Sequence, residues 1–504
     1  MTMSTLQRFL VVLAVLPGLV LPAVVWGNGW EWHSIPIDAL VAGLDSEEPS
    51  ERSYAIRAFG MRQDNTAVGR IIEISSSPEE LTSVRREALA ALGSIKDPVA
   101  VEPLIREIST GSSPELRGLA GVSLAKIGGD AALDALLAAF GEEQSLLART
   151  DLVAALGHFV EPRAILALAQ EQRNSRSANL RRRAVIALGT TESPRATPFL
   201  VEALKRAENR SFIGDVVDAL GRTGGAEALQ PLTALLADST DLNLRVRVIV
   251  ALGAIREGGT SRALIKLLDD PRAPIRYHAI RALGARGDVD AGSALMKAYA
   301  TIAAQQASNQ SDALFSLTMR YELIKALTAI APVEAASIFR DAAVPMTYPR
   351  DSAMGLRLNE AAYQVRRAAI WGLGYSNDDR SVAFVLQNAI EDKDFRIRSV
   401  AVRSLGVLAR PQAFPALKRA LEDEVAEVRW QAALVLGRSG NVAAVSGLQQ
   451  ALKDNHSEVR LRSARALGYL NALAARPALT LVSKNDPSSK VRRAAQHSLS
   501  LLRD

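Results

Sequence analysis

The ten residues Val459–Gly468, VRLRSARALG, carry the pattern that decides the fold of this chain. Close copies stand at Val365–Gly374 (VRRAAIWGLG) and Ile397–Gly406 (IRSVAVRSLG). The small residue that closes each copy returns every 31 to 33 residues, except for two consecutive intervals of 44 and 46 residues. The closing residues are Gly60, Gly93, Ala125, Gly157, Gly189, Gly221, Gly253, Gly284, Thr328, Gly374, Gly406, Gly437, Gly468 and Ser500. A period of this length indicates one repeat array and not several separate globular domains.

Each copy has the spacing of a helix, because small or apolar residues recur four positions apart, as Val365, Ala369 and Leu373 do. The upstream half of each unit contains a second helical stretch, for example Ala100–Ser109 (AVEPLIREIS), followed by a short polar turn. Two helices joined by a turn and stacked on their neighbours form a solenoid. The sequence therefore predicts an all-α fold, an α-solenoid wound as a right-handed superhelix of about 14 helical hairpins.

One polar position is almost constant, since an arginine follows the first residue of every copy except at Ile213. An aspartate often stands six residues upstream of it. The clearest pairs of this kind are Asp270 with Arg276, Asp392 with Arg398, Asp423 with Arg429 and Asp454 with Arg460. A guanidinium can bind carboxylates in a fork, from its own turn and from the next one. We interpret these residues as a structural Asp–Arg ladder along the stack, and not as ligand-binding groups.

The combination of D-x5-R with VRxxAxxALG resembles HEAT repeats, of the short bacterial type also found in phycobilisome-lyase-like proteins. The resemblance covers about Ile35 to Asp504, nearly the whole chain after its N-terminal segment. It implies that the second helix of each hairpin lines a concave surface. It says little about function, because HEAT arrays serve many unrelated tasks.

The N-terminal segment differs from the rest of the chain. Phe9–Val25 is an apolar run behind Arg8, interrupted by two prolines and followed by Trp26–Trp32 (WGNGWEW). Residues 1–27 resemble a secretory signal peptide, with an uncleaved membrane anchor through residues 9–25 as the alternative. Both predict an exported protein, either free in a bacterial periplasm or anchored in the inner membrane and facing the periplasm. The absence of cysteine excludes thiol catalysis and thiolate metal sites.

The register breaks in two consecutive units, near Tyr299–Ser316 and near Asp341–Glu360. We expect three segments: an N-terminal array over residues 35–300, two repeats with insertions over 301–360, and a C-terminal array over 361–504. The two insertions should lie side by side, and the first should lengthen a helix or add a loop. The second contains Tyr348 and Arg350, which favours contact with a partner, although a tolerated surface insertion is the alternative.

The net charge is +6, and the basic residues gather on one predicted face. Positions 2, 3 and 6 after the start of each copy should point outward, and from Arg367 onward they carry basic and not acidic charges. The candidate partner-binding residues there are Arg367, Trp371, Arg403, Trp430, Arg462 and Arg465. A basic, aromatic groove suits an acidic protein segment, an anionic glycan or a nucleic acid, although export argues against nucleic acid. An ordinary solvated helix face is the alternative.

No catalytic constellation stands out, and no cofactor or metal site is predicted. The five histidines are scattered, and none precedes a glutamate, unlike the His-Glu pairs with which HEAT-like deoxyhypusine hydroxylases bind iron. The leading hypothesis is a non-catalytic protein-interaction scaffold or adaptor of the bacterial cell envelope, binding another protein of acidic surface through its concave face and its insertions. The alternative is a HEAT-like lyase, or a nucleic-acid-binding or repair factor, that uses the basic groove.

Overall fold

The computed structural model describes residues 35–503 apart from residues 208, 257–258 and 331–333. The predicted leader at residues 1–27 lies outside the described residues. The chain forms two compact units, residues 1–238 and 239–504. Their boundary falls inside the predicted N-terminal array of residues 35–300, and both insertions therefore belong to the second unit.

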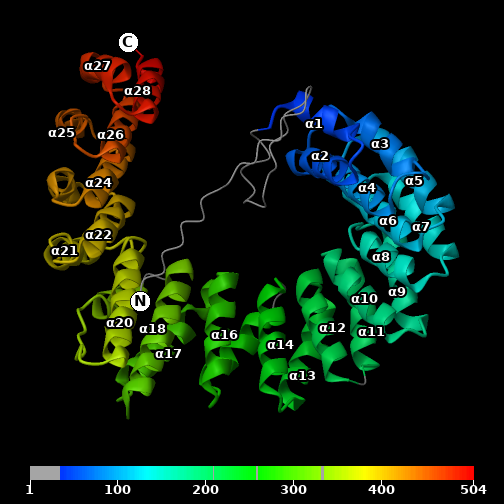
Figure 1. The fold of residues 1–504 in the computed structure, drawn as a ribbon. Helices are drawn as coiled ribbons and strands as arrows, with labels where there is room; N and C mark the ends of the chain where they lie inside the picture. Colours follow the sequence, from blue (N-terminus) through cyan, green and yellow to red (C-terminus); the bar gives the residue numbers. More distant parts are fainter. Residues whose placement is uncertain (1–34, 208, 257–258, 331–333, 504) are drawn as a thin grey trace. The chain divides into compact units, whose positions relative to one another are not determined.

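In the described part of the chain the structure has helices and no strands, which confirms the all-α solenoid (Figure 1). The α-helices of unit 1 are α1 (Ile37–Leu44), α2 (Pro49–Arg62), α3 (Val68–Ser76), α4 (Thr82–Ile95), α5 (Val101–Thr110), α6 (Pro114–Ile127), α7 (Asp130–Glu142), α8 (Leu146–Leu156), α9 (Pro162–Asn174), α10 (Ala178–Thr190), α11 (Thr197–Lys205), α12 (Arg210–Thr223) and α13 (Leu229–Asp238).

The α-helices of unit 2 are α14 (Leu242–Ala254), α15 (Thr260–Lys266), α16 (Ala273–Arg286), α17 (Gly292–Ala304), α18 (Gln310–Ile330), α19 (Ala335–Ala342), α20 (Ala353–Leu373), α21 (Asp379–Asn388), α22 (Phe395–Leu408), α23 (Phe414–Arg419), α24 (Ala426–Arg438), α25 (Val445–Ala451), α26 (Ser457–Tyr469), α27 (Arg476–Asn485) and α28 (Ser489–Leu501). Short 3-10 turns precede several odd-numbered helices, as Pro411–Ala413 does before α23.

Within each unit an odd-numbered helix packs on the even-numbered helix that follows it, and the even-numbered helices also pack on one another in an unbroken row. In Figure 1 the even-numbered helices of a unit lie along one side and the odd-numbered helices along the other. The ten-residue pattern marks the even-numbered helices. Its apolar positions form the core, since Val365, Ala369 and Leu373 of α20 are fully buried.

The glycine that ends the pattern lies where two even-numbered helices approach most closely. A Cβ on Gly437 of α24 would lie 2.7 Å from the Cα of Ala466 on α26, and a Cβ on Gly60 of α2 would lie 3.0 Å from the Cα of Ala91 on α4. The first distance is shorter than real Cβ atoms show, and the second is tighter than nearly all of their contacts. Glycine therefore recurs because it lets successive repeats stack without a gap.

The two insertions lengthen neighbouring helices. Helices α18 and α20 have 21 residues each, against 14 each in α16 and α22, and they pack on each other. This agrees with the expectation that the insertions lie side by side and that the first one lengthens a helix. None of the described helices has both the length and the apolar character needed to cross a bilayer.

Candidate functional site

The arginine column of unit 2 makes two kinds of contact. Nη1 of Arg429 donates to the main-chain carbonyl of Asp423 at 2.8 Å. Nε and Nη2 of the same arginine donate to the carboxylate of Asp454, in the next repeat, at 2.7 and 2.9 Å. The arginine therefore binds the main-chain carbonyl of its own turn and the carboxylate of the next repeat. The sequence had suggested carboxylates from both turns. The same contacts join Arg398 to Asp392 and Asp423, and Arg460 to Asp454 and Asp486.

Each ladder aspartate also holds the turn that starts the next helix. Oδ1 of Asp454 accepts from the main-chain N–H of His456 at 2.8 Å. Burial would raise the pKa of the Asp454 carboxyl, but the hydrogen bonds from Arg429 and His456, together with the charge of Arg429, bring this pKa below its ordinary value. The side chains of Arg429 and Asp454 are only 13% and 11% exposed. These residues are therefore committed to stacking and are not available to a ligand.

The ladder changes at the insertions. Nη1 of Arg276 donates to the main-chain carbonyl of Asp270, but no ion pair with a described carboxylate follows in the next repeat. Arg320 donates to the Tyr299 hydroxyl at 2.9 Å and lies over the ring of Tyr299. The neighbouring ion pairs are Arg245 with Asp270 and Arg366 with Asp392. Neutral contacts and the apolar contact of α18 with α20 replace the ionic contacts here.

Unit 1 contains a ladder that uses glutamate. The ion pairs are Arg52 with Glu80, Arg85 with Glu107, Arg117 with Glu143 and Arg149 with Glu171. The glutamates stand five, six or ten residues before the next arginine, so a search for aspartate at six residues missed them. Because a glutamate side chain is longer than that of aspartate, the glutamate can stand at several sequence positions and its carboxylate still reaches the guanidinium of the preceding repeat.

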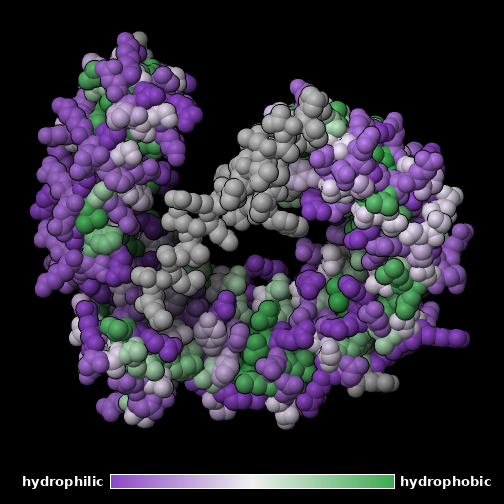
Figure 2. All heavy atoms as spheres, viewed as in Figure 1, coloured by the Kyte–Doolittle hydropathy of each residue, from purple (hydrophilic) through white to green (hydrophobic). Residues whose placement is uncertain are grey.

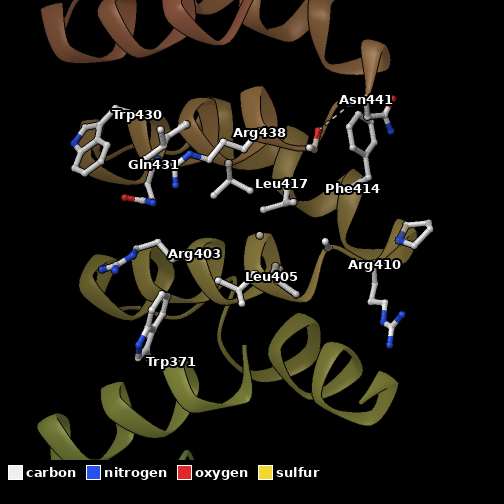
Figure 3. Close-up of a pocket in the computed structure, with 17 residues that line it drawn as sticks. Trp371, Arg403, Leu405, Arg410, Phe414, Leu417, Trp430, Gln431, Arg438 and Asn441 are labelled. Carbon is white, nitrogen blue, oxygen red and sulfur yellow. Dashed lines mark hydrogen bonds between the residues drawn. The ribbon is translucent and has the colours of Figure 1, made fainter. Parts of the chain in front are cut away.

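A hollow of about 650 Å³ opens between α22 and α24 on the even-numbered side of unit 2. Figure 3 shows Trp371, Arg403 and Trp430 at one end and Arg410 at the other. The residues between them are mainly apolar: Leu405, Phe414, Leu417, Leu434 and Val435. The hollow thus combines an apolar floor with basic and aromatic ends.

Arginine and tryptophan side chains stack at the rim. The guanidinium of Arg403 lies 4.5 Å from the ring centroid of Trp371, and Tyr375 meets that ring edge-on at 5.1 Å. Such stacking fixes the plane of the guanidinium while its N–H groups, which point outward in that plane, remain available for an anion. Arg462 lies over Trp430 in the same way, at 5.7 Å.

A second hollow of about 430 Å³ lies one repeat further, between α24 and α26. Its lining includes Arg462, Arg465 and Tyr469, and it shares Leu434 and Arg438 with the first hollow. We call the two hollows together the C-terminal groove. The two hollows lie on either side of α24, which contributes the shared residues to both.

Three arginines of the C-terminal groove have no carboxylate or hydrogen-bond partner in the described part of the chain. The exposed side chains of Arg403, Arg438 and Arg465 make no ion pair and no hydrogen bond there. Arg462 differs, because Glu458 on the same helix neutralises it at 2.7 Å. The groove therefore carries a row of three uncompensated positive charges, one on each of α22, α24 and α26.

The predicted outward face is corrected in part. Positions 2 and 3 are buried in some repeats, at Ser399, Val400, Gln431 and Leu461, because the neighbouring even-numbered helix covers them. Arg367 is exposed and forms no ion pair with a described residue, but it lines neither hollow. Position 6 is the dependable outward position, and it places Trp371, Arg403 and Arg465 on the groove.

The second insertion lies apart from the groove. Its loop is held on α20 by Asn359, which accepts from the Tyr348 N–H at 3.1 Å and donates to the Tyr348 carbonyl at 2.9 Å. The carbonyl of Pro349 approaches Gly355 so closely that no Cβ would fit. Arg350 is exposed beside a separate hollow of about 280 Å³, which shares no residue with the C-terminal groove. The eight predicted partner-binding residues therefore do not form one site.

Some groove residues were not predicted from the sequence. Arg438, Tyr375 and Tyr469 lie beyond the glycine that ends the pattern, whereas the prediction was confined to the ten residues. The available signal was helical spacing, since each stands four residues after the outward position 6. Phe414 comes from α23, an odd-numbered helix outside the pattern.

The surface around the groove is mixed in character. Figure 2 shows small hydrophobic areas among hydrophilic residues over α21 to α28. Among the described residues, no group of three His, Cys, Asp or Glu side chains is placed to hold a metal ion. The groove therefore offers charge, hydrogen-bond donors and aromatic surface.

Comparisons with known proteins bear on the fold. No curated protein matches the chain in sequence. Among solved structures, the Kap95:Nup1 complex contains a similar chain, with a TM-score of 0.51, 14% identity and coverage of 92% of this chain and 76% of that one. A Kap121p mutant gives a TM-score of 0.50 at 11% identity, covering 92% of this chain and 62% of its own. Human deoxyhypusine hydroxylase is 22% identical over 55% of this chain and 96% of its own, but its TM-score is only 0.24.

These structures speak for the fold alone, because their sequence identities are low. The family model described as HEAT repeats matches residues 37–124, 82–157, 165–245, 237–310, 352–433 and 420–500, which together make up most of the chain. The repeated pattern, the paired helices and this match lead to one conclusion: the chain belongs to the HEAT-repeat family.

Proposed function

We propose that this chain is a non-catalytic scaffold of the bacterial cell envelope that holds an acidic segment of another protein in its C-terminal groove. The observation that carries the proposal is the row of Arg403, Arg438 and Arg465. Elsewhere in the array, many arginines on even-numbered helices pair with carboxylates of the chain itself, as Arg57 does with Glu87. Single exposed arginines such as Arg183 and Arg222 form no ion pair with a described residue. Stacking does not need the three unpaired charges, so a ligand is the natural acceptor for them.

The chemistry of the groove favours a protein over a small molecule. Arginine and tryptophan are enriched among the residues that dominate protein–protein binding energy, and Arg403, Trp371 and Trp430 meet at one rim. The two hollows lie on either side of α24 and both open to the surface, which suits a segment of another chain more than a small molecule. A HEAT array of similar fold is known in a complex with another protein, Nup1.

A cell-based capture experiment tests the proposal. Reversing the charges with Arg403→Glu, Arg438→Glu and Arg465→Glu should abolish cross-linking to the partner in intact cells. The matched control carries Lys418→Glu, Lys453→Glu and Lys484→Glu, three exposed changes between α23 and α27 that lie outside the groove. The control should capture the same partner as the unaltered chain. Equal capture by both triple variants would rule the groove out as the docking site.

The envelope location rests on the apolar residues 9–25 and their flanks. Fractionation of cells that express the full chain should place it in the periplasm or on the inner membrane. Recovery of the chain in the cytoplasm would overturn this part of the proposal, and it would revive the lyase and nucleic-acid alternatives.

The insertion at Tyr348 and Arg350 is a second proposed contact. Deleting it would remove the start of α20, so point changes are the cleaner test. Arg350→Glu should weaken capture of the partner without altering stability, because Arg350 is exposed and makes no ion pair with a described residue. Unchanged capture would mark the insertion as a tolerated addition to the surface.

A further inference from the structure

We propose that a hollow in unit 1 binds the phosphate group of a small molecule, which is either free phosphate or a phosphate ester. The site is separate from the C-terminal groove and does not depend on the proposed function. It lies at the repeat formed by α11 and α12, where the ladder loses both of its residues. Ile213 stands at the arginine position of this repeat, and Ala207 stands six residues earlier, at the aspartate position.

This loss leaves the arginine of the preceding repeat without a carboxylate. Nη1 of Arg181 donates to the main-chain carbonyl of Ser175 at 2.8 Å, which is the same contact with its own turn that Arg429 makes. In Arg429 the Nε and Nη2 groups form the fork with the next repeat. The same groups of Arg181 form no ion pair and no hydrogen bond with a described residue.

An aspartate at position 207 would complete the ladder. Arg460 and its partner Asp486 are 26 residues apart, and Arg181 and Ala207 have the same separation. Asp486 stands three residues before the first residue of α28, and Ala207 stands three residues before that of α12. Because the methyl group of Ala207 offers no acceptor, Arg181 keeps the donors that a ladder carboxylate would bind.

A hollow of about 560 Å³ lies at this place and has an excess of positive charge. Four arginines line it: Arg173, Arg181, Arg182 and Arg206. Among the described residues, two carboxylates neutralise three of them. Glu202 pairs with both Arg173 and Arg206, and Asp215 pairs with Arg182. Arg181 is the arginine that remains for a ligand.

The other polar groups of the hollow favour a phosphate over a carboxylate. The side chains of Asn209, Ser175 and Ser211 line it beside the guanidinium groups. Oδ1 of Asn209 accepts from the main-chain N–H of Phe212 at 2.9 Å, so its amide NH₂ group is left to donate. A carboxylate offers two acceptor oxygens, whereas a phosphate ester offers three and matches the fork of a guanidinium equally well. A phosphate therefore uses these donors more fully.

The size of the hollow leaves room for more than the phosphate. Pockets for small molecules typically have volumes of about 300–1,000 Å³, and this hollow falls within that range. The half-buried ring of Phe212 adds an apolar wall. The organic part of a phosphate ester can lie against this ring while the phosphate binds Arg181.

Isothermal titration calorimetry of the full chain tests the site, with inorganic phosphate and glycerol phosphate as ligands at constant ionic strength. The unaltered chain should bind phosphate, and Arg181→Gln should abolish binding. Because Arg181→Gln also removes the contact with Ser175, circular dichroism checks the folding of this variant. A second variant, which adds a group and removes none of the contacts of Arg181, keeps the test independent of folding.

This second variant is Ala207→Asp, which supplies the ladder carboxylate. It should weaken phosphate binding by about tenfold or more, because the new carboxylate occupies the fork of Arg181. It should also raise the melting temperature without phosphate by about 2 °C. The matched control is Ser239→Asp, which adds the same charge at the same position one repeat later, where the preceding repeat has Ile213 in place of arginine. The control should change neither quantity.

The two ligands distinguish the source of the phosphate group. Binding of inorganic phosphate alone identifies the free anion, and tighter binding of glycerol phosphate identifies an ester. The proposal is overturned if neither ligand binds or if Ala207→Asp binds as tightly as the unaltered chain. It is also overturned if Arg403→Glu with Arg438→Glu and Arg465→Glu abolishes binding, since the phosphate would then occupy the C-terminal groove.

One further variant concerns Glu208, which follows Ala207 in the chain and lies outside the described residues. Glu208→Gln should bind phosphate at least as tightly as the unaltered chain does. Binding that appears only in Glu208→Gln would show that Glu208 already neutralises Arg181, and the proposed site would then be discarded.

Discussion

The arginines on the even-numbered helix face are mostly paired with carboxylates in unit 1 and gather unpaired in the C-terminal groove of unit 2. In unit 1 several face arginines are neutralised across repeats, as Arg57 is by Glu87 and Arg86 by Glu115. The exposed Arg183 and Arg222, which form no ion pair with a described residue, stand singly. In unit 2, on α22 to α26, the corresponding face carries Arg403, Arg438 and Arg465 without such partners in the described residues. Both faces belong to helices with the same repeated pattern. The difference teaches that free arginines are not a requirement of the fold, and that a binding role is the simplest reason to keep them unpaired.

The largest expected effect is a difference in peptide binding between charge reversal in the C-terminal groove and charge reversal on the face of unit 1. Arg403→Glu with Arg438→Glu and Arg465→Glu should weaken binding of an acidic peptide, such as fluorescently labelled hexaglutamate measured by fluorescence anisotropy at low salt, by roughly 100-fold, since three charge-assisted contacts become repulsive. The comparison variant reverses Arg57, Arg86 and Arg182, which pair with Glu87, Glu115 and Asp215. It should change the affinity less than about twofold. Equal losses in both variants would show that net charge alone, and not the groove, attracts the peptide.

Alanine substitutions should lower the free energy of unfolding more at ladder arginines than at groove arginines. Arg429→Ala leaves the half-buried Asp454 without its fork and should lower the free energy of unfolding by about 2–3 kcal/mol. Arg403→Ala removes only a stacking contact and should cost less than about 1 kcal/mol. Urea denaturation followed by circular dichroism measures both changes. If the two costs were equal, the distinction between structural and available arginines would be lost.

A third effect should appear in acid. Several ladder aspartates have a pKa below the ordinary value, although burial acts in the other direction, because arginine and main-chain N–H groups hydrogen-bond to the carboxylates. Their contribution to stability is present above the unfolded-state pKa of about 3.9 and is lost as the pH falls through the lower folded-state pKa. The melting temperature of the chain should therefore drop below about pH 4. Asp454→Asn should flatten this drop, and an unchanged pH profile in that variant would count against the ladder.

The smallest effect should come from the exposed pairs of unit 1. Arg57 and Glu87 are 43% and 32% exposed, so Glu87→Gln should change the free energy of unfolding by less than about 0.5 kcal/mol. The same change frees a positive charge and makes the face of unit 1 more like that of unit 2. Weak retention of the acidic peptide by unit 1 would then appear at low salt and vanish at high salt. A large decrease in the free energy of unfolding would show that these exposed ion pairs stabilise the stack.

Much of the fold follows from residues that repeat. Stacked helical hairpins can be predicted from three repeated features: the closing glycines, the apolar positions four residues apart and the arginine column. Each feature meets a packing requirement that every repeat shares. The insertions could also be predicted, because they interrupt the regular interval between closing residues. The helices they lengthen, α18 and α20, pack together because their repeats are consecutive.

The candidate site was harder to predict because it depends on which charges are left over. Arg462 and Arg465 look alike in sequence, but Glu458 one turn away neutralises only Arg462. Arg438 lies outside the repeated pattern, and its importance appears only when two hollows are seen to share it. Pairing across repeats cannot be read from one repeat, and the glutamate ladder of unit 1 was missed for the same reason.

The contact of α18 with α20 gives unit 2 a centre that does not depend on protonation. Ionic contacts couple the repeats from α20 onward, whereas Arg320 binds the neutral hydroxyl of Tyr299. Nearest-neighbour coupling governs how repeat arrays unfold, so acid should uncouple the C-terminal hairpins first. Unfolding that begins at the C-terminal hairpins should then stop at α18 and α20. The chain thus has a built-in point of arrest, and proteolysis near pH 3 would leave a resistant fragment centred on residues 310–373.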